Sequence, residues 1–563
     1  MKQLNSILLA LFLLPSVVFA QQKPDVRTVT TKVADLLMQV PAQNTATHNA
    51  VMKELAALGE PAIKNIASKL VSPGKGNDAV MRYAISGLTK YVGQGSDGRQ
   101  KRATSTALLN AMATAKDDEV RDFILQEAQY VAGDEAVPLV RKYLTSNRLA
   151  DPAARLLLRV GSNNAYNALL YALSTGKGNP QLTLVKALGD AQYTPAVKNL
   201  LQQWPKATNN NLKKSILRSL AQIGDATATN ILESAAQISN YTFDSVDATG
   251  SYLVFLGRQL EKGNKAYVEK SANAILANAT TPEQIKSAAL TLLSQSAANN
   301  ATPEIVAGLK STDEKYRGTA IGLLSNAYTP AASTEVQNIL KGTTNSKLQI
   351  GLMNLLANKE DKSALPILTN LLNSTDRQVQ LSAIDAVAKA GKQDAIAPLI
   401  NLLQNADKET INAVKNALLT VAGNAVTDAA AKALPQAGPD AKIALVEMIA
   451  SRMADEHTGL LLNETASNNA AVKLAAATAL ASVAKQNDID KIAQLLNTAG
   501  NAPLEKAYQT ALYKALAKNP SKAEQLATTQ KLMQGSGNNQ QLYYNVLSDI
   551  GGKEALAVVL EDF

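Results

Sequence analysis

Cysteine is absent from the chain. Its absence excludes a disulfide-stapled scaffold, a thiol nucleophile, a thiolate metal site and a lipoprotein anchored through an N-terminal cysteine. Aromatic residues are also scarce, at 4% of 563 residues. The stability of the folded chain must therefore come from the packing of aliphatic side chains.

Histidine, the usual acid–base group near neutral pH, occurs only at His48 and His457. His457 follows Asp455 and Glu456, but the surrounding sequence offers neither a second histidine nor a carboxylate cluster at helical spacing, as a metal site would need. We interpret these residues as surface or helix-capping residues. No serine lies in a Gly-x-Ser-x-Gly elbow. The sequence therefore predicts no catalytic residue, no metal site and no cofactor.

Long hydrophobic runs are missing after the first twenty residues. The opening MKQLNSILLALFLLPSVVFA combines a basic residue, an apolar run and small residues at its end, which is the pattern of a secretory signal peptide. The apolar run is shorter than the roughly 20 residues that span a membrane. We predict a signal peptide over 1–20, no transmembrane segment, and export to the periplasm or cell surface of a Gram-negative bacterium.

A short repeated module is the main feature of what remains. A single core rarely grows beyond roughly 250–300 residues, so this length requires several domains or an elongated array. The stretches 361–391 and 392–423 favour the array, because Leu371-Leu372 recurs as Leu402-Leu403 and Asp376 recurs as Asp407.

Each module has the pattern of two short helices joined by a turn. In the stretch 392–423 two stripes of apolar residues keep helical spacing, and Asp407 lies between them, where it can cap the second helix. Gly391 and Gly423 are expected to end second helices. The first stripe is Ile396, Leu399, Ile400 and Leu403, and the second is Ile411, Val414, Leu418, Val421 and Ala422.

Repetition of this pattern predicts an all-α fold, a right-handed α-solenoid of about fifteen helical hairpins spaced roughly 33 residues apart. We expect a capping helix region over 21–50 and the repeat array over 51–563. Second helices should begin near residues 78, 118, 151, 180, 210, 246, 281, 313, 345, 378, 409, 440, 470, 503 and 538.

The stretch 117–144 resembles the HEAT-repeat family, in the short variant known from phycobilisome lyases. The residues that carry the resemblance are Asp118, Val120, Arg121, Gly133, Asp134, Ala136, Val137, Pro138 and Leu139. Later modules match less well, since Asn412 stands where the arginine would be. The resemblance implies an armadillo/HEAT-like superhelix, and the family mostly supplies binding scaffolds.

Two segments depart from the regular pattern. Four aromatic residues gather in an irregular insertion near 237–263, where they either pack in the local core or form a ligand-binding platform: Tyr241, Phe243, Tyr252 and Phe255. Residues 93–98 spell the glycine fingerprint of dinucleotide binding, but a predicted helix precedes them, so we expect a flexible loop. Arg99, Lys101 and Arg102 follow, and could meet phosphate or anionic headgroups or remain solvated.

A solenoid exposes much groove surface per residue, which suits elongated partners. We therefore expect an exported, non-catalytic scaffold that binds a protein or an extracellular polymer such as a polysaccharide. In the alternative, the chain is the scaffold region of a larger carbohydrate-active enzyme with a 3-keto-disaccharide hydrolase-like domain beyond Phe563. Whether the chain is an enzyme and how it oligomerises stay open.

Nucleic-acid binding, as in some HEAT-like glycosylases, is a third possibility. Residues 21–200 contain 22 basic and 15 acidic residues. This basic excess would favour nucleic-acid binding, but the predicted export from the cytoplasm argues against such a partner. We therefore expect no nucleic-acid partner. At the other end, Leu556, Val559 and Leu560 share one face of a helix that no second helix follows. We expect either a chain that continues past Phe563 or an end that docks on a partner or a second copy.

Overall fold

The computed structural model describes residues 26–561, and none of these residues lies in a strand. The prediction of an all-α fold is confirmed. The predicted signal peptide over 1–20 lies outside the described residues. Among residues 26–561, every helix is too short or too polar to span a bilayer.

The chain divides into two compact units after Asn264, between one helical hairpin and the next. The first unit contains α1 (Val29–Leu37), α2 (Thr45–Leu58), α3 (Glu60–Ala67), α4 (Ala79–Gln94), α5 (Gly98–Thr114), α6 (Asp118–Ala128), α7 (Val137–Val140), α8 (Ala150–Val160), α9 (Asn163–Leu173), α10 (Asn179–Asp190), α11 (Val197–Gln203), α12 (Asn210–Ile223), α13 (Thr229–Ile238) and α14 (Ala248–Glu261).

The second unit begins at Lys265 and repeats the same alternation. It contains α15 (Lys265–Ala277), α16 (Glu283–Ala297), α17 (Thr302–Gly308), α18 (Glu314–Asn326), α19 (Pro330–Gly342), α20 (Ser346–Asn358), α21 (Leu365–Asn370), α22 (Arg377–Gly391), α23 (Ile396–Leu402), α24 (Lys408–Thr420), α25 (Ala425–Ala433), α26 (Pro439–Ser451), α27 (Thr458–Glu464), α28 (Ala470–Val483), α29 (Ile489–Asn497), α30 (Ala502–Leu516), α31 (Lys522–Gln534), α32 (Tyr544–Ile550) and α33 (Lys553–Glu561).

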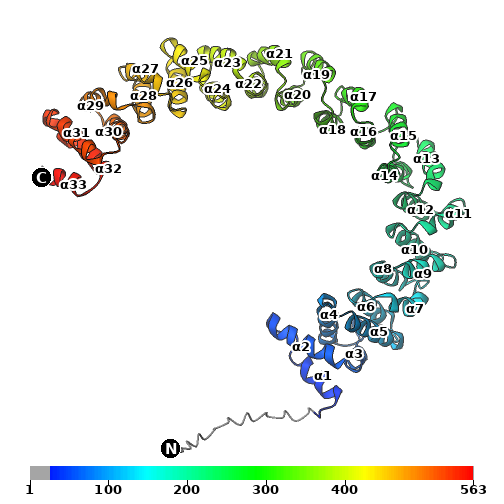
Figure 1. Ribbon diagram of the computed structural model, residues 1–563. Helices are drawn as coiled ribbons and strands as arrows, with labels where there is room; N and C mark the ends of the chain where they lie inside the picture. Colours follow the sequence, from blue (N-terminus) through cyan, green and yellow to red (C-terminus); the bar gives the residue numbers. More distant parts are fainter. Residues whose placement is uncertain (1–25, 562–563) are drawn as a thin grey trace, which may run out of the picture. The chain divides into compact units, whose positions relative to one another are not determined.

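Even-numbered helices form one row in each unit. In the first unit α8, α10, α12 and α14 contact one another in succession, and in the second unit α20, α22, α24 and α26 do the same (Figure 1). Four successive even helices of the first unit, α6, α8, α10 and α12, each contribute a leucine that is 0% exposed: Leu125, Leu157, Leu188 and Leu220. Because these residues recur 31 or 32 positions apart, one repeated side chain builds a continuous core.

The predicted hairpins are confirmed in number and place. Fifteen hairpins run from the pair α3 and α4 to the pair α31 and α32, and fourteen of the fifteen expected second-helix starts lie within two residues of the observed ones. The last expected start, residue 538, is wrong. A 3-10 helix occupies Gly537–Tyr543, with a non-helical backbone at Asn539, so α32 begins only at Tyr544.

The ends of the second helices show which side chains cap them. The Asp407 carboxylate accepts a hydrogen bond of 2.8 Å from the Thr410 amide at the start of α24, as predicted. Gly423 has φ +92° just after α24, a conformation that favours glycine. Gly391 does not play this role, because the next residue, Lys392, takes the positive φ of 49°. Ala422 is also exposed, since α24 ends at Thr420 and the buried stripe stops at Val421.

Candidate functional site

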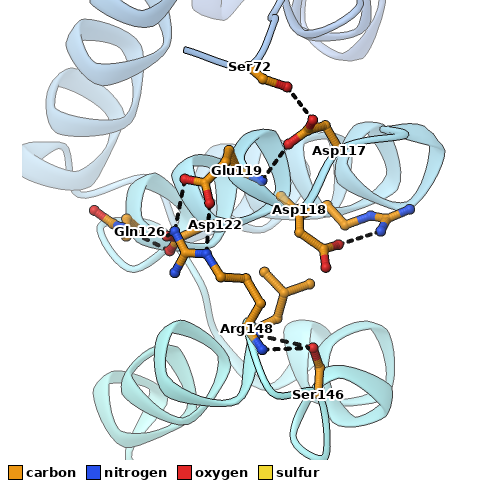
Figure 2. Close-up of polar contacts among 10 residues, drawn as sticks. Ser72, Asp117, Asp118, Glu119, Asp122, Gln126, Ser146 and Arg148 are labelled. Atoms are coloured by element: carbon orange, nitrogen blue, oxygen red, sulfur yellow. Dashed lines mark hydrogen bonds and ion pairs between the residues drawn. The ribbon is translucent and has the colours of Figure 1, made fainter.

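The acidic start of α6 joins three successive repeats (Figure 2). Ser72, in the connection before α4, donates a hydrogen bond to the carboxylate of Asp117. Arg148, in the connection before α8, donates to Glu119 at 2.8 and 2.9 Å and to Asp122 at 2.6 Å. The hydrogen bonds from Arg148 hold the pKa of Glu119 below its ordinary value. These carboxylates are therefore committed to links between repeats.

The resemblance residues Asp118 and Arg121 have a structural role as well. Arg121 donates to the Asp118 carboxylate and to the carbonyl oxygen of Ala115, both at 2.6 Å, which fixes the connection between α5 and α6. Val120 lies in the core at 4% exposure. The motif residues thus stabilise the repeat, and their side chains are not available to bind a partner.

An open groove runs along α10, α12 and the start of α14. Its volume is about 710 Å³, and polar side chains line it. Lys186 of α10 and Lys214 and Arg218 of α12 are exposed there. Lys214 lies 3.9 Å from Asp247, whereas Lys186 and Arg218 have no carboxylate within 4 Å among residues 26–561. We call this hollow the basic groove, after its three cations Lys186, Lys214 and Arg218.

Ion pairs also line four other hollows. The hollow near α20 and α22 carries the pairs Lys362 with Asp394 and Lys392 with Glu360. The hollow along α24 and α26 carries Lys415 with Glu447, 2.6 Å apart. The remaining two include Lys286 with Glu283 and Lys75 with Asp117. Two of these hollows also expose lysines without a carboxylate within 4 Å among residues 26–561, Lys310 in one and Lys64 and Lys116 in the other. The basic groove differs in that its two unpaired cations, Lys186 and Arg218, lie one repeat apart on adjacent helices.

The predicted aromatic site is divided between core and surface. Tyr252 and Phe255 lie in α14 at 1% and 0% exposure, and Tyr241 is also buried, at 6%. Phe243 is 71% exposed. Within 237–263 the backbone is irregular over 239–247 and in the turn at 262–263, because α14 occupies Ala248–Glu261. Three of the rings therefore belong to the core of the first unit, and Phe243 is the ring that a ligand could contact.

The predicted basic segment lies on a helix. Arg99, Lys101 and Arg102 occupy the first turns of α5, and the loop expected over residues 93–98 is confined to 95–97, between α4 and α5. Asp97 caps this helix by accepting hydrogen bonds from the amides of Arg99 and Gln100, and these bonds lower the pKa of Asp97. Arg99 and Arg102 are exposed, and Lys101 is partly buried. The structure does not bring these cations to the basic groove, which lies on α10, α12 and α14.

Residues that meet across repeats were missed by sequence reasoning. Lys186 and Arg218 are 32 positions apart, one repeat period, and the stacking of α10 on α12 brings them to one groove. In the same way His457 meets Asp428, 29 positions earlier, although the local sequence showed no second ligand. The repeat period was the signal that could have found both pairs.

Comparison with known proteins places the fold. The chain is similar to the crystal structure of Kap121p bound to Nup53p, at 12% identity and TM-score 0.50, over 94% of this chain and 74% of that one. It is also similar to importin beta in an ammonium sulfate condition, at 11% identity and TM-score 0.38, over 92% and 77% of the two chains. A TM-score of 0.50 at this identity supports the fold alone.

The family comparison gives a more local result. The search of curated proteins found no match. A family model of HEAT repeats matches residues 333–419, which span α20 and α22 and most of α24. Residues 26–561 therefore form an all-helical α-solenoid, and the segment 333–419 within it matches HEAT repeats.

Proposed function

We propose that this chain is a scaffold whose basic groove binds an acidic segment of a protein partner. The observation that carries the proposal is the pair of exposed cations Lys186 and Arg218 on one open groove. Neither cation has a carboxylate within 4 Å among residues 26–561, although Asp190 and Asp247 also line the groove. Exposed cations attract negatively charged ligands and raise their rate of encounter. Asn211, Gln222 and Ser215 add hydrogen-bonding groups along the same groove.

A protein partner suits the fold. The similar structure of Kap121p is described as bound to Nup53p, so a related helical array holds another protein. The surface along a row of stacked helices is continuous, so an extended segment of a partner protein can contact several repeats at once. No comparison favours the alternative of a carbohydrate-active enzyme. The narrower resemblance to repeats of phycobilisome lyases is carried only by the motif in 117–144.

We also propose that the protein is exported. The support is the sequence of residues 1–20, with its basic residue, apolar run and small residues at the end. N-terminal sequencing of the protein isolated from its own cells tests this point. A mature chain that begins near Gln21 is expected, and a chain that retains Met1 would contradict export.

Binding of a defined acidic probe tests the groove. We would measure fluorescence anisotropy of a labelled oligoglutamate peptide with the full chain at low salt. The double variant Lys186→Glu/Arg218→Glu should weaken binding about tenfold or more, because each change replaces an attraction by a repulsion, and tenfold corresponds to about 1.4 kcal/mol. Added salt should also weaken binding.

The matched control is Lys198→Glu/Lys206→Glu, which changes the net charge equally in the same unit. Both lysines are exposed, and they lie on α11 and the short helix after it, away from the basic groove. Equal weakening by the control would show that only the total charge matters. A preference for duplex DNA over the peptide would contradict a protein partner.

A further inference from the structure

Three potential metal ligands converge where two repeats of the second unit meet. Asp428 belongs to α25, whereas Glu456 and His457 belong to the 3-10 turn Asp455–His457 that precedes α27. The His457 Nε2 atom lies 3.1 Å from Asp428 Oδ1 and 4.0 Å from Glu456 Oε1. The three ligand atoms all lie within 4.8 Å of one another.

A hydrogen bond from His457 to Asp428 would link the repeats without a metal, but it leaves the second carboxylate unexplained. Glu456 faces the same ring nitrogen, and neither carboxylate has a lysine or arginine at ion-pair distance among residues 26–561. The adjacent Asp455 is different, since Lys485 pairs with it at 3.2 Å. Two anionic groups at one imidazole create a local negative charge that a cation would neutralise.

The exposure of the three side chains suits a ligand that enters from solvent. The His457 side chain is only 16% exposed, so its ring is held in place. Asp428 and Glu456 are exposed at 64% and 46%, which leaves them free to adjust to an ion. The rigid group thus supplies the nitrogen and the mobile groups supply the oxygens.

We propose that Asp428, Glu456 and His457 bind a divalent transition-metal ion of the Zn²⁺ type. Zinc binds histidine nitrogen and carboxylate oxygen at about 2.0–2.2 Å, so tetrahedral ligand atoms lie about 3.4 Å apart. The observed separations of 3.1 and 4.0 Å bracket this value. A set of one imidazole and two carboxylates favours zinc over Ca²⁺ and Mg²⁺, which prefer oxygen ligands alone.

Such an ion would also join two repeats. Its ligands come from α25 and from the turn before α27, so a bound ion adds a link between elements that otherwise meet here through the contact of His457 with Asp428. An ion that binds only the folded state stabilises it. Zinc should therefore slow amide exchange in α25 and α27 more than elsewhere in the second unit.

Calorimetric titration of the tag-free, metal-free full chain with zinc chloride tests the site. We expect one binding event, weakened at least tenfold in His457→Ala and in Asp428→Asn. The second variant is the informative one, because an asparagine oxygen still accepts a hydrogen bond from His457 while the charge of the ligand is lost. Amide exchange with and without zinc gives the second readout.

Asp455→Asn is the matched control, since it removes the neighbouring acid that pairs with Lys485. It should bind zinc like the parent chain. The proposal is overturned if zinc does not bind, if Asp428→Asn binds as tightly as the parent, or if Asp455→Asn weakens binding as much as His457→Ala. Binding of Mg²⁺ with equal strength would overturn the choice of metal class.

Discussion

Asp361 is a residue on which two repeats depend. It precedes α21, and its carboxylate accepts hydrogen bonds from Tyr328 at 2.5 Å and from Ser333, both in the preceding repeat. Ser363 donates to it through its hydroxyl at 2.6 Å and its amide at 3.0 Å. Burial alone would raise the pKa of Asp361, but the hydrogen bonds from Ser333, Ser363 and Tyr328 outweigh burial and lower it.

Replacement of Asp361 by asparagine should therefore destabilise the junction between these repeats. A hydrogen bond to a charged acceptor contributes about 1.5–3 kcal/mol and one to a neutral acceptor about 1, so each of the four bonds weakens by about 0.5–2 kcal/mol. We expect a total loss of roughly 2 kcal/mol or more at pH 7. Because the folded-state pKa is lowered, this contribution is present above the unfolded value and disappears as pH falls through the folded-state pKa. Amide exchange in α19 and α22 at about pH 7 and about pH 3 measures it.

Asp385→Asn serves as the comparison at the same scale. Asp385 pairs with Lys389 on the surface of α22, with half of each side chain exposed. Exposed pairs of this kind contribute less than about 1 kcal/mol. A loss in Asp361→Asn that equals the loss in Asp385→Asn, or that persists unchanged in acid, would contradict the role given to Asp361.

Sequence reasoning succeeded for residues that act within one module and failed for residues that act between modules. Asp407 could be predicted as a cap because a cap and its amide are three residues apart. The meeting of His457 with Asp428 requires the register of one repeat on the next. The register cannot be read from the sequence where the modules differ in length, as they do between 237 and 263.

At the scale of elements, the way a helix ends decides whether glycine is needed. Gly423 has φ +92°, and a Cβ added there would meet only Gln393 Nε2, at 3.6 Å. Space is therefore available, and the cost of Gly423→Ala comes from the backbone conformation alone. We expect a destabilisation of about 1–2 kcal/mol, seen as a lower calorimetric transition of the second unit.

Gly318 gives the opposite expectation. It lies inside α18, has no positive φ, and a Cβ there would meet nothing within 4 Å. Gly318→Ala should stabilise the helix by about 0.5–1 kcal/mol. Shifts of the same sign in the two variants would show that the helix ends are not set by the backbone as described.

Elements could be predicted well because each carries its own signals. Capping residues and apolar stripes located fourteen second helices to within two residues. The exception, α32, follows the segment Gly537–Tyr543, which forms a 3-10 helix that no local signal separates from the start of an α-helix. The expected role of Gly391 also failed. A Cβ added at this position would lie 2.8 Å from Leu365 Cδ1, so glycine is needed there for packing, which only the tertiary structure shows.

At the scale of the whole molecule, each unit is stabilised by contacts between adjacent repeats. Even helices contact the even helix before and after them, and the polar links join side chains about one repeat apart, as Arg377 does with Asp407 and Glu409. Stability in such an array is close to a sum of repeat and interface terms. The repeat pattern could be read from the sequence, whereas the basic groove and the partner depend on exposed residues that the pattern leaves free.

The most direct test of this account is amide exchange of Leu403→Ala. Leu403 is 4% exposed in the core of the second unit, and its truncation should cost about 2–5 kcal/mol. Because contacts run between neighbours, protection should fall from α21 to α26 and remain unchanged from α6 to α12. A uniform loss of protection along the whole chain would contradict the account, because it would mean that a single global core holds the molecule together.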